Sequence, residues 1–521
     1  MGTATAATAP AATASTARSG HAQAKDKFFA ASMYMFHITG FPQQPGVLPG
    51  QVDAPPGARL DVWGTDPADS RHIPGPGGDG VLLSTPHFSL ANSGNRTLHA
   101  PKRSWKVTLP HEGGHGNGAG PGNGAGHGHH LAGMARINLK SMYNDPSQMR
   151  EALAWRMFGA AGVPAARHTY AKLAFDATYY GLFSVIEQVD KRFLADHFGE
   201  NDHGNLYKAY CGDVGCATLE HRTGPGGDDS GRQYYKSADE DHRTYRLKAC
   251  GDDQDAGSYD DLAAFIRVIN GVGLPGGDGR FGTDAYRASV DGIMNVPAFL
   301  RWAGVNLLLG SWDNYYATPS NYYLYNSGRA GAGRDVRDAP YFTFIPWDYD
   351  NCLGIDYFGT QWQYTDILNW PSNTEAYWRH HARSRIPLVQ NLLRNPHCQG
   401  YYLDHLEYLL DTQFNPGAIE ALIGRDSGDG LWGRVSQAAY LESTTPYGPP
   451  FTGRQFTNDE VYRAGCRQNE LHHGQEKADG IMNYVRMRYD RARQQLAEIR
   501  KTTPRETGDF PATMEPLPAA K

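Results

Sequence analysis

The chain has 521 residues, enough for a large hydrophobic core and for more than one lobe. Its content of 40% hydrophobic and 12% aromatic residues indicates a folded protein. A net charge of −6 gives no electrostatic argument for nucleic-acid binding. The sequence contains no apolar run of about 18 residues, so it predicts no membrane span.

Segments of biased composition divide the chain. Residues 1–24 are rich in Ala and Thr and lack the apolar stretch of a signal peptide, so we expect a disordered leader there. Residues 501–521 are expected to be a disordered tail. Gly-rich and polar stretches at about 111–133 and 211–258 are expected to be flexible insertions. The rest of the chain, residues 25–500, is expected to fold.

The cysteines leave the redox compartment open. No two of them form a CxxC pair, but Cys211 and Cys216 are close enough in sequence to close a small loop. An even number of cysteines permits disulfide bonds without requiring them. The cysteines are Cys211, Cys216, Cys250, Cys352, Cys398 and Cys466.

The first half of the folding region predicts strands, one helix and a hairpin. Residues 103–110 (RSWKVTLP) alternate polar and apolar side chains, which is typical of a strand. A helix is predicted to begin at Asp145 as its N-cap, with Pro146 in the first turn, and to end at Gly162. Two β-rich runs within residues 169–190, separated by an Asp-Ala pair, predict a hairpin.

The second half predicts mainly helices and one further hairpin. A strongly apolar helix at 296–310 leads through a short polar segment into strands at 321–326 and 341–348. The short connection between these strands predicts that they are antiparallel. A basic amphipathic helix is predicted at 481–499. The order of these elements predicts an α+β fold with two lobes.

Polar residues gather at the ends of the second hairpin. Asp313 follows the apolar helix, Asn321 opens the first strand, and Asp348 and Asp350 end the second. The hairpin can bring these side chains together at one end. Phosphoryl transfer needs such a set, with one Asp to orient the acceptor hydroxyl and an Asn and an Asp to hold the metal ion. Oxygen ligands favour Mg²⁺ or Mn²⁺ over zinc.

Asp348 is our first choice as the direct metal ligand because it is the first carboxylate after the apolar run. Asp350 is expected to hold a second ion or to cap the following turn. Pro346 requires a strand end or an edge strand, because it has no N–H to donate. Taken singly, each Asp is more often a cap or turn residue. A calcium-stabilised module is a third interpretation, which we rank last because no EF-hand spacing is present.

A nucleotide also needs a cation at its phosphates and backbone groups for its base. Lys106 lies on the polar face of the predicted strand, and Lys102 is the fallback; a solvated basic strand edge is the alternative. The backbone of Glu187, Gln188 and Val189, at a strand end, is predicted to bind adenine; a helix cap is the alternative. The chain has neither a GxGxxG nor a GxxxxGK[ST] motif.

Several longer stretches between residues 100 and 354 carry a family resemblance. They are, in order, APKRSWKVTL, NLKSMYNDPSQMREALAWRMFGAAGVP, YYGLFSVIEQVDKRFLADHFG, GNLYKA, LLLGSWDNYYATPSNYYLYN and FIPWDYDNCLG. In this combination they resemble the spore coat protein H (CotH) kinase family. The motifs EQVDKRFL, GNLYK and PWDYD are specific together, although each would be weak alone.

The resemblance implies an atypical, two-lobed protein-kinase-like fold, with an N-lobe at about 25–190 and a C-lobe at about 191–500, interrupted by Gly-rich loop insertions. It implies that ATP and Mg²⁺ (or Mn²⁺) bind, and that phosphate is transferred to Ser or Thr of a secreted, coat or surface protein. We therefore expect an extracellular, cell-surface or spore-surface protein, with nucleotide and protein partners and no nucleic acid.

By position within the matching motifs, Asp313 corresponds to the family's catalytic aspartate and Asn321 to the adjoining asparagine. Asp348 and Asp350 correspond to its metal-binding strand end. The alternative function is a non-catalytic, kinase-fold protein that binds a partner in surface or coat assembly. The retained acidic residues favour the enzyme, because a scaffold has little need for them.

Overall fold

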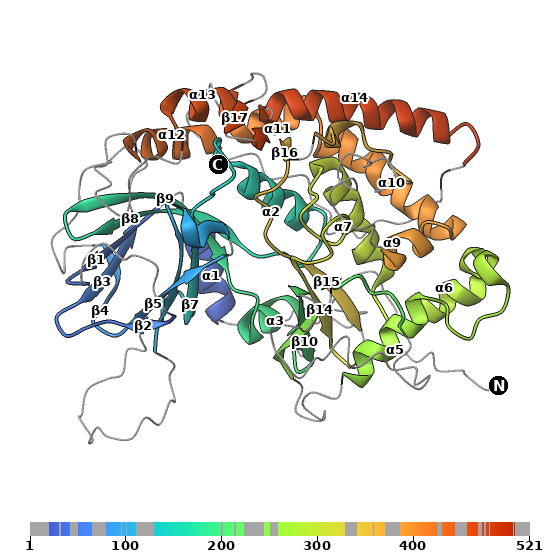
Figure 1. Cartoon of the computed structure of the whole chain (residues 1–521), viewed down its shortest axis with the longest axis horizontal. Helices are drawn as coiled ribbons and strands as arrows, with labels where there is room; N and C mark the ends of the chain where they lie inside the picture. The colour runs from blue at the N-terminus through green and yellow to red at the C-terminus, as the bar shows by residue number, and fades with distance from the viewer. Residues whose placement is uncertain are drawn as a thin grey trace, which may run out of the picture.

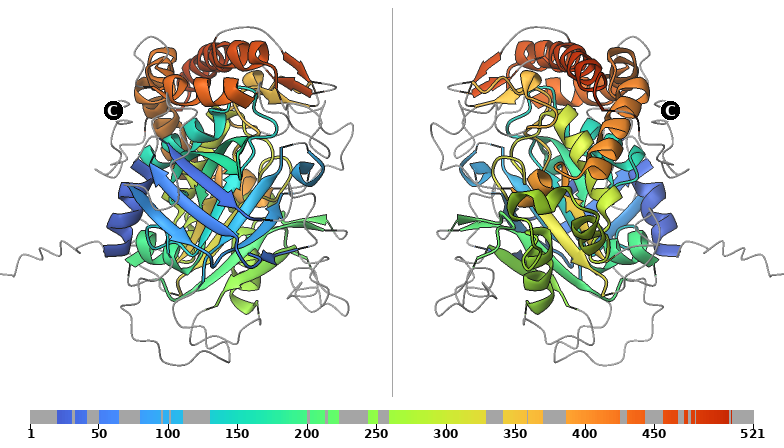
Figure 2. Two further views of the ribbon diagram at one scale, coloured as in Figure 1. Left: turned by 90° about the vertical axis from the view of Figure 1, so that its left-hand side faces the viewer. Right: turned by 90° about the vertical axis from the view of Figure 1, so that its right-hand side faces the viewer.

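In the computed structural model, the N-terminal part of the chain is built around a curled sheet (Figure 1). Its strands are β1 (Tyr34–Thr39), β2 (Val52–Asp53), β3 (Arg59–Gly64), β4 (Val81–Thr85), β5 (Ser89–Ser93), β6 (Ser104–Thr108), β7 (Arg136–Lys140), β8 (His168–Phe175) and β9 (Thr178–Glu187). Their order is β2-β5-β6-β7-β9-β8-β1-β3-β4. All neighbours are antiparallel except β1 and β8, which are parallel. Figure 2 shows these strands crossing obliquely, with the C-terminal helices above them.

The structure describes residues 20–30, 33–41, 50–64, 80–94, 96–100, 102–110, 130–199, 202–212, 215–222, 244–250, 259–328, 341–357, 359–369, 386–424, 430–442, 456–466, 471–473, 476–478, 480–503 and 505. Most of the expected leader, insertions and tail lies outside the described residues, namely 1–19, 111–129, 223–243, 251–258 and 506–521. A helix begins at Gly20, within the segment expected to be a leader.

Alternation of side chains explains the strands that the sequence predicted. In β6, Trp105 and Val107 are fully buried inside the curled sheet, whereas Lys106 is on the opposite face. The predicted hairpin is confirmed as β8 and β9, which meet at Asp176. Asp176 has a φ of 47°, a left-handed conformation that Asp tolerates better than most residues.

A second, smaller sheet lies beside the first. It consists of β10 (Asn205–Ala209), β13 (Tyr245–Ala249), β14 (Tyr322–Asn326) and β15 (Phe342–Pro346), in the order β13-β10-β14-β15. The predicted antiparallel pairing of β14 with β15 is confirmed, with Tyr322 opposite Pro346. Pro346 ends an edge strand, as its missing N–H requires. Two minor sheets contain β11 (Cys211–Gly212) and β12 (Gly215–Cys216), and β16 (Ile355–Asp356), β17 (Leu471–His473) and β18 (Glu476–Ala478).

Helices lie around both sheets and extend across the top of Figure 1. They are α1 (Gly20–Ala30), α2 (Arg150–Ala160), α3 (Lys191–Phe198), α5 (Asp260–Ile269), α6 (Asp284–Asp291), α7 (Val296–Leu309), α9 (Pro387–Leu392), α10 (Pro396–Thr412), α11 (Pro416–Ile423), α12 (Leu431–Leu441), α13 (Asn458–Cys466) and α14 (Ile481–Ile499). Short 3₁₀ helices span Arg96–His99, Gly277–Gly282 and Trp362–Tyr364. The predicted apolar helix is confirmed as α7, which packs on β15, α10 and α14.

The helix α2 begins later than the sequence predicted. Asp145 does not cap it; its carboxylate accepts hydrogen bonds from the backbone N–H groups of Ser147 (2.9 Å) and Arg150 (2.8 Å). It also pairs with the buried guanidinium of Arg150. The Asp-Pro pair therefore forms a turn before the helix, and the helix begins only at Arg150.

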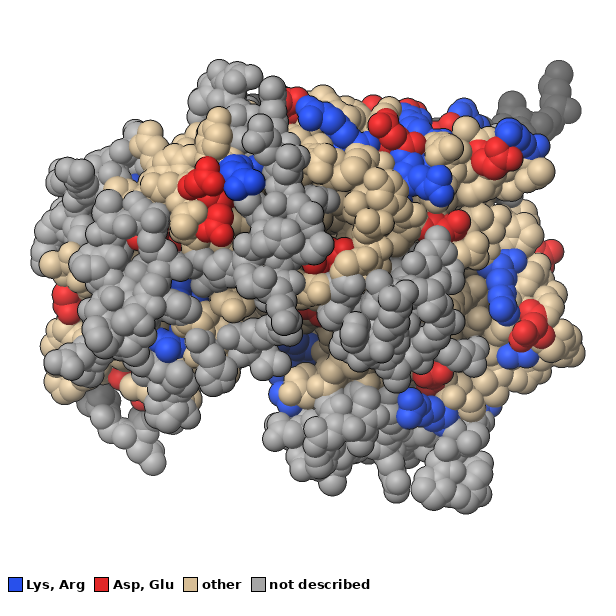
Figure 3. Space-filling view, turned by 45° about the horizontal axis from the view of Figure 1, so that its top comes forward, with Lys and Arg blue, Asp and Glu red and all other residues tan. Residues whose placement is uncertain are grey.

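The basic helix α14 packs on the protein body, with both signs of charge on its outer side. Its arginines pair with acidic residues of the neighbouring helices: Arg486 with Glu420, Arg493 with Asp411, and Arg500, at its end, with Asp404. Figure 3 shows Lys and Arg interleaved with Asp and Glu across this face.

Two large hydrophobic cores contain most of the buried apolar side chains of the described residues. One lies inside the curled sheet and contains Trp105. The other is larger and runs from α2 and one face of β9 to the second sheet and the helices; it includes Leu153, Ile186, Leu307 and Tyr349. Because the second core crosses from one sheet to the other, it fixes β9 and α2 relative to the end of β15. The architecture is mixed α+β, as predicted.

Candidate active site

A lysine and two carboxylates from three different elements meet between the sheets. Lys140 Nζ, at the end of β7, donates a hydrogen bond to Glu151 Oε1 of α2 at 2.8 Å. The same ammonium pairs with the carboxylate of Asp348, just after β15. Glu151 is buried, whereas the Asp348 side chain is about one-third exposed. Lys140 therefore links the first sheet and α2 to the end of the second sheet.

Local structure explains why these three side chains point to one place. In β7 the apolar residues Ile137 and Leu139 enter the core of the curled sheet, so Lys140 lies on the opposite face. Glu151 is in the first turn of α2, where the helix dipole favours a carboxylate. Asp348 has a φ of 63°, and this left-handed conformation ends the extended backbone of β15.

Asp350 experiences an excess of negative charge. Burial raises the pKa of Asp350 well above its usual value, and the charges of Asp348, Glu151 and Asp313 raise it further against the opposing effect of Lys140. Burial lowers the pKa of Lys140, but Asp348, Glu151 and Asp350 outweigh burial and raise it well above its usual value. Lys140 is thus held as a cation among several carboxylates.

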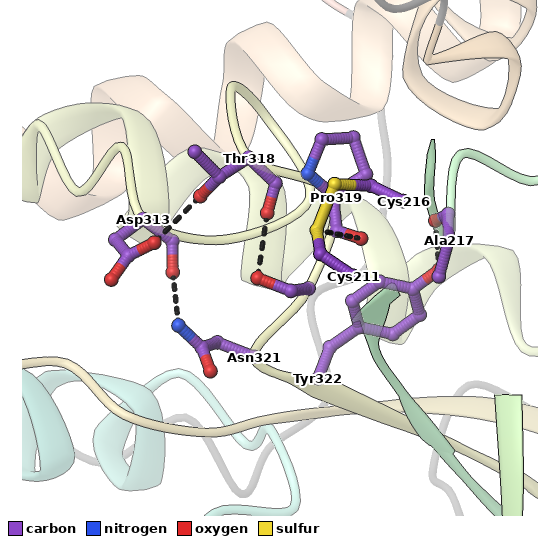
Figure 4. The surroundings of a disulfide bond; sticks show 9 residues. Cys211, Cys216, Ala217, Asp313, Thr318, Pro319, Asn321 and Tyr322 are labelled. Carbon is purple, nitrogen blue, oxygen red and sulfur yellow. Dashed lines mark hydrogen bonds between the residues drawn. A yellow bond between two sulfur atoms is a disulfide. The ribbon is translucent and has the colours of Figure 1, made fainter. Parts of the chain in front are cut away.

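Asp313 is held by hydrogen bonds to both carboxylate oxygens. Thr318 Oγ1 donates to Oδ1 at 2.7 Å (Figure 4), and Asn351 Nδ2 donates to Oδ2 at 3.0 Å. Asp313 follows α7, whose C-cap Gly310 has a φ of 59°; a Cβ there would lie 2.0 Å from the hydroxyl of Tyr484. Only glycine fits this position, so the turn into Asp313 is fixed by packing.

Asn321 connects Asp313 to the end of β15. Its Nδ2 donates to the backbone carbonyl of Asp313 at 2.8 Å (Figure 4), and its own carbonyl accepts from the backbone N–H of Trp347 at 3.1 Å. Asn321 has a φ of 52°, so both ends of this hairpin base are left-handed. Such conformations in non-glycine residues cluster at functional sites. The predicted set Asp313, Asn321, Asp348 and Asp350 therefore lies in one region.

A cluster of basic side chains extends outward from Asp348. Burial lowers the pKa of Lys208, on β10, to about 8; Asp348 opposes this, whereas the charges of Lys248 and Lys106 add to it. Burial and the charges of Arg136 and Lys248 lower the pKa of Lys106. Among the described residues, neither Lys106 nor Lys208 has an ion-pair partner. Mutual repulsion of this kind favours an anionic ligand.

A cavity of about 740 Å³ adjoins the outer end of this cluster. Its lining includes Arg136 and Lys248 of the cluster and the start of α3, at Asp190, Lys191 and Arg192. Asp190 is occupied as the N-cap of α3, because its side chain accepts from the backbone N–H groups of Arg192 and Phe193. The basic surface therefore continues from the carboxylate site into an open cavity.

The fallback lysine, Lys102, is in a different environment. Its ammonium donates to Glu442 Oε1 at 2.6 Å, and both side chains are buried. The backbone N–H of Leu182 donates to the same oxygen at 2.7 Å. A Cβ at Gly181 would lie 2.8 Å from this oxygen, so the backbone of β9 comes close to the pair. Lys102 joins the curled sheet to the end of α12 and does not contact Asp348.

In the segment predicted to bind adenine, the Glu187 side chain forms ion pairs with two basic residues elsewhere in the fold. The Glu187 carboxylate accepts from Lys25 of α1 at 3.0 Å and from Arg167 at 2.6 Å. Gln188 Oε1 accepts from Asn138 Nδ2 of β7 at 3.3 Å, and Val189 is buried. Asn138 and Lys106 are cross-strand neighbours, so Gln188 lies beside the face that carries Lys106.

The donor set fits a hard divalent cation in chemistry. Asp348, Asp350 and Asn321 offer only oxygen ligands, and the surplus of carboxylates around Asp350 is a charge that Mg²⁺ or Mn²⁺ would balance. Within the described ranges, no three Asp, Glu, His or Cys side chains are gathered in metal-binding geometry. A cation here would therefore need further oxygen ligands from water or a nucleotide, which is usual for Mg²⁺.

Lys140, Glu151 and Lys208 are not among the site residues predicted from the sequence. The signal for Lys140 was present, because β7 alternates Ile137 and Leu139 with polar residues and is followed by a helix with Glu151 in its first turn. Lys106 shows the same alternation on the neighbouring strand, so periodicity alone could not distinguish the two lysines. The packing of α2 against the sheet distinguishes them.

Comparison with known proteins identifies two relatives. Inner spore coat protein H of Bacillus subtilis is 24% identical over 230 residues, which cover 44% of this chain and 52% of that protein. Invasin CotH2 of Rhizopus delemar is 22% identical over 271 residues, which cover 52% of this chain and 38% of that protein. The chain thus spans about half or less of the length of these curated relatives.

The described part of the chain contains no helix long and apolar enough to cross a membrane. A family model described as CotH kinase protein matches residues 90–426, more than half of the chain. This range contains Lys140, Glu151, Asp313, Asn321 and Asp348. The chain therefore belongs to the CotH kinase protein family.

Proposed function

We propose that the protein is an ATP- and divalent-metal-dependent phosphotransferase that phosphorylates Ser or Thr of another protein. The observation that carries this proposal is the contact of Lys140 with both Glu151 and Asp348. In protein kinases, a strand lysine paired with a helix glutamate, together with a metal-binding aspartate, must be assembled for phosphoryl transfer. Here the ammonium of Lys140 contacts both the helix glutamate, Glu151, and the aspartate, Asp348.

The corresponding fold proposal is a two-lobed, kinase-like architecture. Its N-lobe contains the curled sheet, in which β7 is followed by α2, and its C-lobe contains the second sheet and the helices. The nucleotide lies between the lobes in this proposal. Its phosphates meet Lys140, Lys106 and Lys208, and its base lies beside the backbone of Gln188 and Val189.

Each residue has a separate chemical role. Asp348 and Asp350, with the amide oxygen of Asn321, hold the divalent cation, which neutralises charge on the phosphates. Lys140 contacts a phosphate oxygen and is oriented by Glu151. Asp313 accepts the proton of the acceptor hydroxyl as its oxygen attacks the terminal phosphorus, and ADP leaves. The hydrogen bonds from Thr318 and Asn351 hold the Asp313 carboxylate in position.

The acceptor is proposed to be a secreted, coat or surface protein. The relatives support this because their names describe a spore coat protein and an invasin. The disulfide between Cys211 and Cys216 also supports an oxidising compartment. We accordingly propose an extracellular, cell-surface or spore-surface location.

The second candidate is a non-catalytic protein that uses the same fold to bind a partner. The invasin's name favours it, since it describes a surface role and no chemistry. The two candidates differ in one testable respect. The enzyme must consume ATP in a metal-dependent way, whereas the binding protein has no such requirement.

The test uses the purified protein with labelled ATP and either Mg²⁺ or Mn²⁺. Autophosphorylation, transfer to added acceptor proteins, and transfer of AMP or glutamate are scored in parallel, because diverged kinase folds can move other groups. Phosphate transfer that is lost in Lys140→Met and in Asp313→Asn supports the proposal. Absence of phosphate transfer with both metals contradicts it.

A further inference from the structure

A disulfide-closed hairpin lies against residues 313–321, called here the catalytic segment because it begins with the candidate catalytic residue Asp313. Strands β11 and β12 pair Cys211 with Cys216, and a disulfide joins the two residues. The sulfur of Cys211 lies 3.9 Å from the carbonyl oxygen of Pro319 (Figure 4). Pro319 is in the short connection between Asp313 and Asn321. The hairpin thus contacts the connection itself.

The residue after the disulfide holds the same connection by hydrogen bonds. The backbone N–H of Ala217 donates to the carbonyl of Pro319 at 2.9 Å. The hydroxyl of Tyr322, next to Asn321, donates to the carbonyl of Ala217 at 2.5 Å (Figure 4). Cys216 fixes the start of this backbone and therefore sets where Ala217 meets Pro319.

The backbone carbonyls of the next two residues, Thr218 and Leu219, also accept hydrogen bonds. The hydroxyl of Tyr315, two residues after Asp313, donates to the carbonyl of Thr218 at 3.1 Å. Asn270 Nδ2 donates to the carbonyl of Leu219 at 2.9 Å. The carbonyls of Ala217 and Thr218 therefore accept from tyrosines within or beside the catalytic segment, whereas the carbonyl of Leu219 accepts from a residue at the end of α5. The disulfide immediately precedes these three residues.

The opposite side of the connection is bonded to Asp313. Thr318 Oγ1 donates to the Asp313 carboxylate, and Asn321 Nδ2 donates to its backbone carbonyl. Ser320 Oγ donates to the carbonyl of Thr318 at 2.8 Å. Residues 318–321 are thus held between Asp313 on one side and the disulfide hairpin on the other. Displacing Pro319 would displace Thr318 and Asn321, two of the partners of Asp313.

We propose that the Cys211–Cys216 disulfide positions the catalytic segment, so that Thr318 and Asn321 keep their hydrogen bonds to Asp313. This inference rests on the proposed phosphotransferase function. The disulfide closes a loop with a sequence separation of only 5 residues. Closing so short a loop removes little chain entropy, so the effect on global stability is smaller than that of a long-range disulfide. The local restraint is the larger effect.

The test compares oxidised wild-type protein with the double variant Cys211→Ser, Cys216→Ser. Cys250→Ser is the matched control, because Cys250 is a partly exposed free thiol just after β13. We expect kcat to fall by about tenfold or more in the double variant, while KM for ATP stays within about twofold, because a small misplacement acts on turnover. We also expect faster amide hydrogen exchange in residues 317–322, and no change in either readout for Cys250→Ser.

Hydrogen exchange separates failure of this inference from failure of the proposed function. If oxidised wild-type protein transfers no phosphate, the proposed function fails, but faster exchange in 317–322 still supports the positioning role. Unchanged exchange in the double variant overturns it, as does unchanged kcat in an active enzyme. If the double variant does not fold, Tyr322→Phe removes the bond to Ala217 with the disulfide intact. A lower kcat at unchanged KM in that variant supports the inference, and unchanged kcat overturns it.

Discussion

The ammonium of Lys140, at the end of β7, pairs with the carboxylate of Asp348, 208 residues later in the sequence. The same ammonium donates to Glu151 at 2.8 Å. The contact therefore depends on the correct relative placement of the curled sheet, α2 and the second sheet. Lys140 makes both contacts only when these three elements are correctly assembled.

Replacing Lys140 should abolish transfer more effectively than replacing Lys106. Lys140→Met removes the cation between Glu151 and Asp348, and we expect kcat to fall by about a hundredfold or more. Lys106→Met should mainly weaken ATP binding, because Lys106 contributes charge to the basic cluster. Steady-state kinetics on both variants make the comparison. Equal, small effects of the two substitutions would argue against a special role for Lys140.

Replacing Lys102 should affect stability instead. Lys102→Met leaves the buried carboxylate of Glu442 without its cation, and breaking a buried ion pair in this way costs about 3 kcal/mol or more. We expect a lower free energy of unfolding in urea, with unchanged ATP affinity in the protein that remains folded. A fully stable variant with weaker ATP binding would instead support Lys102 as the phosphate contact.

The elements of the site were predictable from sequence where a local signal was sufficient. Alternation identified β6, and the order of apolar helix, Asp313, Asn321, β15 and Asp348 identified the carboxylate end of the second hairpin. The start of α2 was predicted wrongly. The Asp145 carboxylate accepts hydrogen bonds from backbone N–H groups of a turn, as it would from those of a helix N-terminus. Local capping signals do not distinguish these two outcomes.

Tertiary contacts account for what the sequence could not provide. Lys106 and Lys140 are both polar residues of alternating strands, and only the position of Glu151 on α2 separates them. Glu187 ends a strand, as predicted, but the buried Lys25 of α1 takes its carboxylate. No local pattern links residue 25 with residue 187. Such pairs become visible only when the sheet has been assembled.

The basic cluster should set the affinity for ATP. Lys208→Met and the double variant Lys106→Met, Lys208→Met remove cations that lack ion-pair partners among the described residues. We expect ATP affinity to fall by about tenfold for the single variant and further for the double variant. Isothermal titration with ATP measures this. Arg287→Met, at a partly exposed position on α6, is the charge-matched control. Unchanged ATP affinity in the double variant would place the nucleotide elsewhere.

Asp313 should act on turnover. Asp313→Asn preserves the shape of the side chain but removes the base, so we expect kcat to fall by about a hundredfold or more with ATP binding unchanged. The measurement is single-turnover transfer together with equilibrium ATP binding. A variant with normal transfer would show that the carboxylate only organises the turn with Thr318 and Asn351.

His168 should make the protein sensitive to acid. Burial, with the nearby charges of Arg156 and Lys140, lowers the pKa of His168 to about 3. An unfolded histidine has a pKa of about 6.5, so between these values only the unfolded state binds the proton. The unfolding free energy therefore falls as the pH is lowered from about 6.5 towards 3. His168→Gln should reduce this fall, as measured by urea unfolding at pH 7 and pH 5. An identical fall in the variant would contradict the assignment.

The most direct test of the central claim is the metal dependence of ATP binding and transfer in Asp348→Asn and Asp350→Asn. Asp291→Asn, at an exposed position on α6, serves as the control. We predict that Asp348→Asn needs much more Mg²⁺ or Mn²⁺ for ATP binding and loses transfer by about a hundredfold, because a neutral amide is a weaker ligand for a hard cation. Asp350→Asn should show a smaller effect in the same direction, and the control none. If both Asp348→Asn and Asp350→Asn keep normal metal dependence and full transfer, the two carboxylates only form a turn, and the proposed phosphotransferase function is wrong.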